Sequence, residues 1–351
     1  MRDTLEDDKT GWNTGATGQA GHGTRLWIVN CLAVVMAGLA LLSGCGRGPA
    51  PADTMPRIGY LQLLEDPQLD EGRRGFLQAL SDAGLVQDRD FVMEYRCAQG
   101  DQVLLPSLMQ SFLRDRVRLI ATSTTPCMLA AAHAVGHARD PVPVVITISS
   151  DPADFGLDPV PPNLTGYYNL NNMEEYLRVI LACLPGPVRR LGLLSNPGEP
   201  NAELAAAAFT IACGEAEIEL CRMPVHSFGD AAAAAQALAA RDVQAIVTAS
   251  DNLVYNAMPV IVRVAEKHRV PVFAAEAGIA RLGAAVGWGL DYCDWGYQSG
   301  TVAGRLLKGA ALSEEPLRPC TRYQIFLNED SCRRQGLPIT AELRRRASKI
   351  I

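Results

Sequence analysis

The stretch that decides the fold covers residues 119–148 and reads LIATSTTPCMLAAAHAVGHARDPVPVVITI. Its two ends, 119–122 and 142–148, are apolar and rich in β-branched residues, without the alternation of a half-exposed strand. Such runs are typical of strands covered on both faces. Between them, residues 127–137 are alanine-rich and favour a helix. A buried strand, a helix and a second buried strand predict a βαβ unit in a parallel sheet.

The same alternation extends in both directions along the chain. Before this stretch we expect strands at 57–63 and 91–97 and helices at 72–83 and 103–115. Beyond it, a proline-rich break at 151–163 precedes a second series. That series has strands at 164–168, 190–194, 217–223, 245–248 and 272–275, and helices at 174–184, 202–212, 231–240 and 253–268. Strands at 284–288 and 323–327 and a helix at 294–308 remain to be shared between the two series. Two such series predict an α/β fold of two doubly wound parallel-sheet lobes joined by a hinge.

The N-terminal region carries an apolar run at 26–45 that ends in Leu42-Ser43-Gly44-Cys45. Small residues directly before a cysteine are typical of a bacterial lipoprotein signal, whose cysteine receives a diacylglyceryl group. We predict a signal peptide with its lipobox at 1–45, lipidation at Cys45 and a flexible Gly/Pro-rich tether at 46–56. The alternative is an uncleaved transmembrane helix, for which the run is short and lacks a following basic cluster. A wrongly assigned start codon would explain why residues 1–25 are long and slightly acidic for a signal.

Composition and charge limit the classes of partner. The chain has 351 residues, of which 48% are hydrophobic and 20% charged, as expected of a folded globular protein. Its net charge of −6 and its lack of a basic block argue against a nucleic-acid partner. Ten cysteines in an exported chain allow disulfides, with Cys213/Cys221 and Cys320/Cys332 as the nearest pairs. Most of the cysteines also fit small apolar core positions.

Signals of catalysis or metal binding are weak. The sequence has no GxSxG, HExxH or phosphate-binding-loop motif, and no GxGxxG after a strand. His133 and His137 share a helix face, as two metal ligands can, but no third ligand is evident and a solvated face is the simpler interpretation. We therefore predict a protein without enzymatic activity, metal or cofactor.

Polar residues follow several predicted strands, at the edge where parallel sheets bind ligands. These sets lie at 122–126, 149–152, 195–199 and 250–252. Each could be an ordinary helix N-cap, but four converging sets predict that some of them bind a ligand. Asp251 and Glu276 are candidates for pairing with a ligand ammonium group, with a salt bridge or a cap as the alternative. Tyr60, Tyr168, Tyr255 and Trp288 could wall an aromatic ligand or belong to the core.

The segments taken together resemble the ABC-transporter substrate-binding protein family, including its tryptophan/tyrosine-type members. The family-like blocks are 58–70, 98–102, 125–126, 150–152, 163–166, 196–199, 250–252 and 289–296. The resemblance implies a type I periplasmic-binding fold, with lobe 1 at 57–166 plus 284–320 and lobe 2 at 167–283 plus 321–351. It also implies that Thr125 and Ser150 lie at a ligand carboxylate, with Asp251 near the amino group. The chain departs from the family pattern at Cys127, Glu276 and Cys293, where alanine, aspartate and tyrosine are frequent.

We therefore expect an exported substrate-binding component of an ABC importer, lipid-anchored in the periplasm or at the cell surface. Its partners would be a small amino-acid-like ligand, aromatic ones included, an ABC permease, and the membrane through Cys45. The ligand-binding candidates are Gln62, Thr124, Thr125, Ser150, Asp151, Tyr168, Asn196, Asp251, Asn252 and Glu276. The first alternative is a ligand-sensing lipoprotein that presents its closed state to a membrane receptor. An exported enzyme is disfavoured by the lack of a nucleophile–base pair, and a transcription regulator by the lack of a helix-turn-helix before Arg57.

Overall fold

The structure is a computed structural model that describes residues 55–136 and 142–351, in which the strands form two sheets. The first sheet has the order β11-β5-β4-β3-β1-β2, and all its strand pairs are parallel. Its strands are β1 (Arg57–Gln62), β2 (Val92–Cys97), β3 (Leu119–Ser123), β4 (Val144–Thr147), β5 (Leu164–Tyr168) and β11 (Arg318–Pro319). The strand order reverses at β1, which is the signature of a doubly wound sheet.

The second sheet has the order β13-β12-β10-β9-β8-β6-β7. Its strands are β6 (Arg190–Ser195), β7 (Glu219–Pro224), β8 (Ile246–Thr248), β9 (Val272–Ala274), β10 (Val286–Gly289), β12 (Gln324–Leu327) and β13 (Lys349–Ile350). All pairs are parallel except β10 with β12, which run antiparallel. Together with the flanking helices, the two sheets confirm the predicted α/β class and its two lobes.

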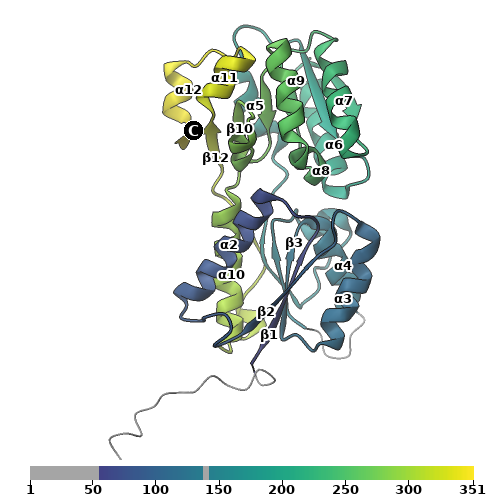
Figure 1. Ribbon diagram of the computed structural model, residues 1–351, viewed down its shortest axis with the longest axis vertical. Helices are drawn as coiled ribbons and strands as arrows, with labels where there is room; N and C mark the ends of the chain where they lie inside the picture. The colour runs from purple at the N-terminus through teal and green to yellow at the C-terminus, as the bar shows by residue number, and fades with distance from the viewer. Residues whose placement is uncertain (1–54, 137–141) are drawn as a thin grey trace, which may run out of the picture. The chain divides into compact units, whose positions relative to one another are not determined.

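Helices cover both faces of the first sheet (Figure 1). They are α2 (Pro67–Asp82), α3 (Leu105–Arg114), α4 (Thr125–Gly136) and α10 (Tyr292–Leu307). Neighbouring residues of β1 point to opposite faces, so Leu61 packs in the core with α3 and α4, and Tyr60 packs in the core with α2 and α10. A β-strand buried on both faces needs a nearly continuous apolar run, which Ile58–Leu61 supplies between Arg57 and Gln62.

Two glycines allow α2 and α10 to pack at very short distance. A Cβ atom built on Gly296 of α10 would lie 1.9 Å from the carbonyl oxygen of Gly72, and one on Gly75 would lie 1.9 Å from that of Cys293. Only residues without a side chain fit such a crossing. This contact fixes the first turn of α10, which carries Tyr292 and Trp295, against the first lobe.

The second sheet is likewise covered on both faces. Its helices are α5 (Met173–Cys183), α6 (Pro200–Glu215), α7 (Ala231–Ala239), α8 (Asn252–Asn256), α9 (Met258–His268), α11 (Glu329–Gln335) and α12 (Ala341–Arg346). One core contains side chains of α5 and α6, and the other contains those of α7 and α9. Short 3-10 helices lie at Gln102–Leu104, Pro152–Phe155, Phe228–Asp230, Ala277–Leu282 and Leu312–Glu314.

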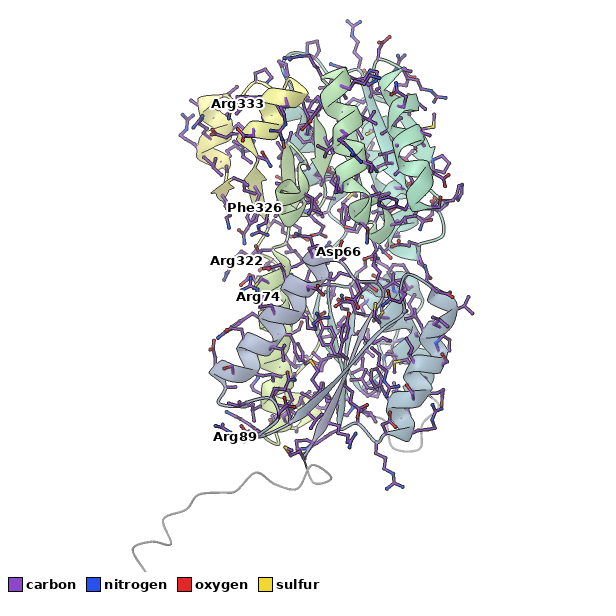
Figure 2. All side chains as sticks on the ribbon, in the orientation of Figure 1. Asp66, Arg74, Arg89, Arg322, Phe326 and Arg333 are labelled. Carbon is purple, nitrogen blue, oxygen red and sulfur yellow. The ribbon has the colours of Figure 1, made fainter. Side chains whose placement is uncertain are left out.

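Three segments connect the two sheets: 169–172 between β5 and α5, 290–291 between β10 and α10, and 320–323 between β11 and β12. Arg322, in the third segment, pairs with Asp294 at 3.3 Å (Figure 2). The hydroxyl of Tyr323 donates to Oδ1 of Asn169 at 2.8 Å and so joins the first segment to the third. These crossings form the hinge that the two-lobed fold requires.

The observed elements include α11, α12, β11 and β13, which were not expected, and three of the expected elements differ in ways that affect the two lobes. The helix expected at 253–268 is interrupted at Ala257, because Pro259 lacks the N–H that would continue α8 into α9. The strand expected at 284–288 is β10, which pairs with β9 and β12 in the second sheet, whereas the family resemblance implies that residues 284–320 belong to lobe 1. Strand β5 continues to Tyr168 in the first sheet, two residues beyond residue 166, where the family resemblance implies that the first part of lobe 1 ends.

The eight cysteines in the described part of the chain are free thiols, including both predicted nearest pairs. Six of them are buried, in keeping with the core interpretation. Within residues 55–136 and 142–351, no helix has the length and apolarity needed to cross a membrane. The predicted signal, Cys45 and most of the tether lie outside the described residues.

Candidate functional site

A small, partly open cavity lies where strands of both sheets end. It is reached by the segments after β3, β4, β5, β8 and β9 and by the first turns of α4, α6, α8 and α10. Its lining consists of Thr124, Thr125, Ile148, Ser149, Ser150, Asn169, Asn201, Ser250, Asp251, Asn252, Glu276, Tyr292 and Trp295. The carboxyl ends of parallel strands are the expected place for a ligand in this class of fold.

The first sheet contributes the N-terminus of α4. Thr124 stands between β3 and α4 with a φ of 101°, a left-handed conformation that is unfavourable for threonine. Its hydroxyl is buried and has no hydrogen-bond partner among the described residues. The hydroxyl of Thr125 accepts a hydrogen bond from the backbone N–H of Ser150 at 3.1 Å, which ties the two strand ends together. A helix N-terminus of this kind attracts an anionic group.

The second sheet contributes Glu276, directly after β9. Its side chain is only 2% exposed, and Oε1 accepts a hydrogen bond from the hydroxyl of Ser250 at 3.4 Å. Oε2 has no hydrogen-bond partner among the described residues. Burial raises the pKa of Glu276 well above its ordinary value of 4.5, although interactions with Ser250 and Tyr292 oppose the rise. A buried acidic group with a free oxygen needs a donor or a cation.

The position of Glu276 depends on the glycines of the neighbouring strand. Gly289 has a φ of 148°, and a Cβ atom there would lie 2.6 Å from the carbonyl oxygen of Ala275. A Cβ atom on Gly287 would lie 2.6 Å from the carbonyl oxygen of Glu276 itself. Glycine at both positions lets β10 approach the segment after β9 closely enough to bury the carboxyl group.

Asp251 also lines the cavity, but its carboxylate is already used inside the protein. Oδ1 accepts from the backbone N–H of Val254 at 2.9 Å, and Oδ2 accepts from the backbone N–H of Asn196. Burial and the neighbouring Glu199 raise the pKa of Asp251 to about 7. Asp251 is therefore the N-cap of α8, the alternative that the sequence left open.

Asn201 completes this side of the cavity, and Glu199 lies behind it, where it holds the start of α8. Oε2 of Glu199 accepts from the side-chain amide of Asn252 at 2.6 Å, and Oε1 accepts from the backbone N–H of Leu253 at 3.1 Å. The amide nitrogen of Asn201 donates to the carbonyl oxygen of Ser250 at 2.8 Å. Its buried Oδ1 has no partner among the described residues. Two free acceptors, Oε2 of Glu276 and Oδ1 of Asn201, therefore belong to the second sheet's side.

Six of the ten predicted ligand-binding residues line the cavity: Thr124, Thr125, Ser150, Asp251, Asn252 and Glu276. The other four lie outside it. Gln62 donates to the carbonyl oxygen of Leu64 at 2.9 Å and to Asp70 at 3.1 Å, while Asp151 and Asn196 accept backbone hydrogen bonds in local turns. Tyr168 packs half-buried at the edge of the first sheet's core. Short polar side chains near strand ends thus serve turns and caps as often as the cavity.

The remaining lining residues were not among the predicted ligand-binding residues. Ser149 and Ser250 adjoin predicted ones, and Tyr292 and Trp295 belong to the family-like block at 289–296. Ile148 directly follows β4, whereas Asn169 and Asn201 carry no signal in the sequence, because only the hinge and the turn into α6 bring them to the cavity.

The chemistry of the lining is asymmetric. It contains two acidic side chains, and none of its described residues is a lysine, arginine or histidine. The first sheet's side offers a hydroxyl and a helix N-terminus, whereas the second sheet's side offers unpaired acceptors and a carboxyl group. Among the described residues, no cluster of His, Cys, Asp and Glu could hold a metal ion. Such a cavity suits a small ligand with a cationic and an anionic end.

A comparison with known proteins identifies the family of the chain. A family model described as ABC transporter substrate binding protein matches residues 57–351. The chain belongs to this family. It is therefore an extracytoplasmic binding protein rather than an enzyme, of the kind that works with ABC permeases. The family resemblance inferred from the sequence is confirmed.

Relatives extend the comparison. A tyrosine-binding protein of Clostridioides difficile (strain R20291) is 24% identical over 318 residues, which cover 87% of this chain and 90% of the relative. A domain from Streptococcus pneumonia, solved in complex with L-Trp, has a TM-score of 0.75 at 21% identity over 85% of this chain and 100% of its own. An open, ligand-free substrate-binding protein with adhesive properties from Clostridium difficile has a TM-score of 0.63 at 26% identity over 84% of this chain and 99% of its own.

Proposed function

We propose that the protein captures a zwitterionic amino acid between its two lobes and delivers it to an ABC permease. The observation that carries the proposal is the pair of unpartnered acceptors, Oε2 of Glu276 and Oδ1 of Asn201, in a cavity whose other side is the N-terminus of α4. An ammonium group has three N–H donors and a positive charge, so it can donate to both of these unpartnered acceptors. A carboxylate suits the helix N-terminus. The tyrosine-binding relative and the L-Trp complex support the ligand class.

Of the two acids expected near the ammonium group, Glu276 is the better candidate. Both oxygens of Asp251 already accept backbone hydrogen bonds, whereas one oxygen of Glu276 has no partner. Tyr292 and Trp295 supply aromatic surface, and the indole N–H of Trp295 donates to the carbonyl oxygen of Tyr167 at 2.8 Å. That hydrogen bond fixes the ring, so an aromatic ligand side chain would meet a rigid face.

Binding would couple to closure, because the site draws residues from both lobes. Contacts between the two lobes include the hydrogen bonds from Gln102 to the carbonyl oxygen of Gly198 at 3.2 Å and from Asn256 to that of Glu65 at 3.4 Å. These long, exposed hydrogen bonds contribute little by themselves. A ligand that contacts both lobes prefers the closed state and shifts the population toward it.

Calorimetry with L-tyrosine and L-tryptophan tests the ligand class. Two analogues separate the charges: 3-(4-hydroxyphenyl)propionate lacks the ammonium group, and tyramine lacks the carboxylate. Each should bind at least ~10-fold more weakly than L-tyrosine, since a charged hydrogen bond contributes about 1.5–3 kcal/mol. Glu276→Gln should weaken amino-acid binding, and Glu174→Gln, at an exposed position on α5, serves as the control. Equal binding of the analogue without an ammonium group would contradict the proposal.

We also propose that Cys45 carries the lipid anchor, as the apolar run and the small residues before it indicate. Two acyl chains hold a protein on a membrane where a single one releases it. Cys45→Ser should therefore move the protein from the membrane fraction to the soluble fraction. A variant that stays with the membranes would overturn the lipoprotein assignment and leave an uncleaved helix as the anchor.

A further inference from the structure

Glu276 faces no positive charge among the residues that the structure describes. The titratable groups that interact with it are Tyr176, Tyr255, Asp291, Tyr292, Cys320 and Tyr323. They come from α5, α8, the start of α10 and the hinge, and none of them is cationic. The nearest arginine along the chain, Arg281, is paired with Asp291 at 3.5 Å and lies over the ring of Phe326.

The contacts of Glu276 suit a neutral carboxylic acid. Oε1 accepts from the Ser250 hydroxyl, Oε2 has no donor at hydrogen-bond distance among the described residues, and the Tyr292 hydroxyl interacts with the carboxyl group from farther away. The buried hydroxyl of Tyr255 also lacks a partner. A carboxylate buried without a cation or several donors is unstable and takes up a proton instead.

We propose that Glu276 is protonated in the ligand-free closed cavity, and that binding of an ammonium group releases this proton to solvent. The inference rests on the proposed function and specifies the protonation state of Glu276 in the proposed site. The balance is one neutral carboxylic acid and one ammonium ligand giving a carboxylate–ammonium pair and one free proton. The ammonium group supplies the positive charge that the lining lacks, so the ionised form becomes stable only in the complex.

Proton release makes the affinity depend on pH. While Glu276 of the ligand-free protein remains protonated, each unit of rising pH should strengthen binding about tenfold, because one proton leaves for each ligand bound. Asp251 also lines the cavity and can add to the pH dependence of the affinity. The variant Glu276→Gln keeps Asp251, so the pH dependence that remains in it is the contribution of Asp251.

Calorimetry in two buffers tests the release. L-Tyrosine and L-tryptophan are titrated at the same pH into the protein in phosphate and in Tris, whose enthalpies of ionisation differ. The apparent enthalpy of binding should differ between the buffers by an amount that corresponds to about one proton for each ligand. Glu174→Gln should keep this difference. Identical enthalpies in the two buffers would overturn the inference, although the proposed function would stand.

A measurement without ligand separates the two proposals. Infrared spectra of the ligand-free protein should contain a carbonyl-stretching band of a protonated carboxylic acid that Glu276→Gln lacks and Glu174→Gln keeps. If this band is present and neither amino acid binds, the proposed ligand is wrong and the protonated Glu276 stands. If the spectra of the native chain and of Glu276→Gln do not differ in this band, the inference is overturned whatever the ligand.

Discussion

Replacing Glu276 by glutamine should stabilise the ligand-free protein while it weakens ligand binding. Glutamine has nearly the shape of a protonated glutamic acid and keeps an acceptor for the Ser250 hydroxyl, which donates to Oε1 at 3.4 Å. It cannot ionise. The substitution therefore removes the cost of a buried carboxylate from the empty cavity, and it also removes the charge that an ammonium group would meet. A substitution that stabilises the ligand-free protein and weakens ligand binding is typical of a residue that is kept for binding at a cost in stability.

The size of the effect follows from the pKa of Glu276, which burial raises well above 4.5. Between the pKa in the unfolded chain and that in the folded chain, the folded protein binds the extra proton. The free energy of unfolding then falls as the pH rises, by about 1.4 kcal/mol for each pH unit. The contribution is fully present below the unfolded pKa and is lost as the pH approaches the folded one. Asp251, with its pKa raised to about 7, gives a slope of the same sign in both proteins, so it cancels in their difference.

Urea unfolding of the ligand-free proteins at pH 5, 6 and 7 measures this difference. The free energy of unfolding of Glu276→Gln, relative to that of the native chain, should increase with each step, by up to about 1.4 kcal/mol. Glu174→Gln, at an exposed position, should follow the native chain at every pH. Parallel curves for the native chain and Glu276→Gln would refute the argument, because they would mean that Glu276 is solvated or paired when the site is empty.

Three other substitutions test the structure. Asp251→Ala removes the acceptor for the N–H groups of Val254 and Asn196 and should lower the free energy of unfolding in urea by about 1–3 kcal/mol; unchanged stability would contradict the role of Asp251 as the N-cap of α8. Gly296→Ala places a Cβ 1.9 Å from the Gly72 carbonyl oxygen and should cost about 1–3 kcal/mol or more in urea unfolding, whereas Gly304→Ala on the same helix, with 3.4 Å to its nearest neighbour, should not destabilise the protein. Trp295→Phe loses the hydrogen bond to Tyr167, about 1 kcal/mol, and should abolish most of the ligand-induced change in tryptophan fluorescence; a full change in the variant would place the ligand elsewhere.

The fold could be predicted because its signal is local. Apolar β-branched runs without alternation mark strands buried on both faces, and β1 and β3 occur where such runs stand. What the local signal does not contain is the sheet to which a late strand belongs. Strand β10 looks like any other buried strand, but its membership of the second sheet is set by its antiparallel pairing with β12, whose sequence lies 35 or more residues further on.

The site was predicted only in part, for a related reason. Thr124, Thr125 and Glu276 directly follow strands, so their place at the sheet edge is fixed by chain continuity. Asn201 reaches the cavity through the turn into α6, and Trp295 reaches it through the close packing of α10 on α2. The spacing of apolar residues along the sequence predicts neither of these. The sequence also does not distinguish a cap from a ligand-binding group. Asp251 and Glu276 are both acids after strands, and only the contacts show that the first is used by the protein and the second is not.

The unused oxygen of Glu276 also explains why closure should depend on ligand. In an open form, water can hydrate the carboxylate, and closing the lobes removes that water. Without a ligand, closure then requires either a proton or an unpaired buried charge, and both raise the free energy of the closed state at neutral pH. A bound ammonium group removes this cost at the place where it arises. A permease needs to distinguish the empty protein from the loaded one. One acidic side chain that has no partner within the fold can supply this difference.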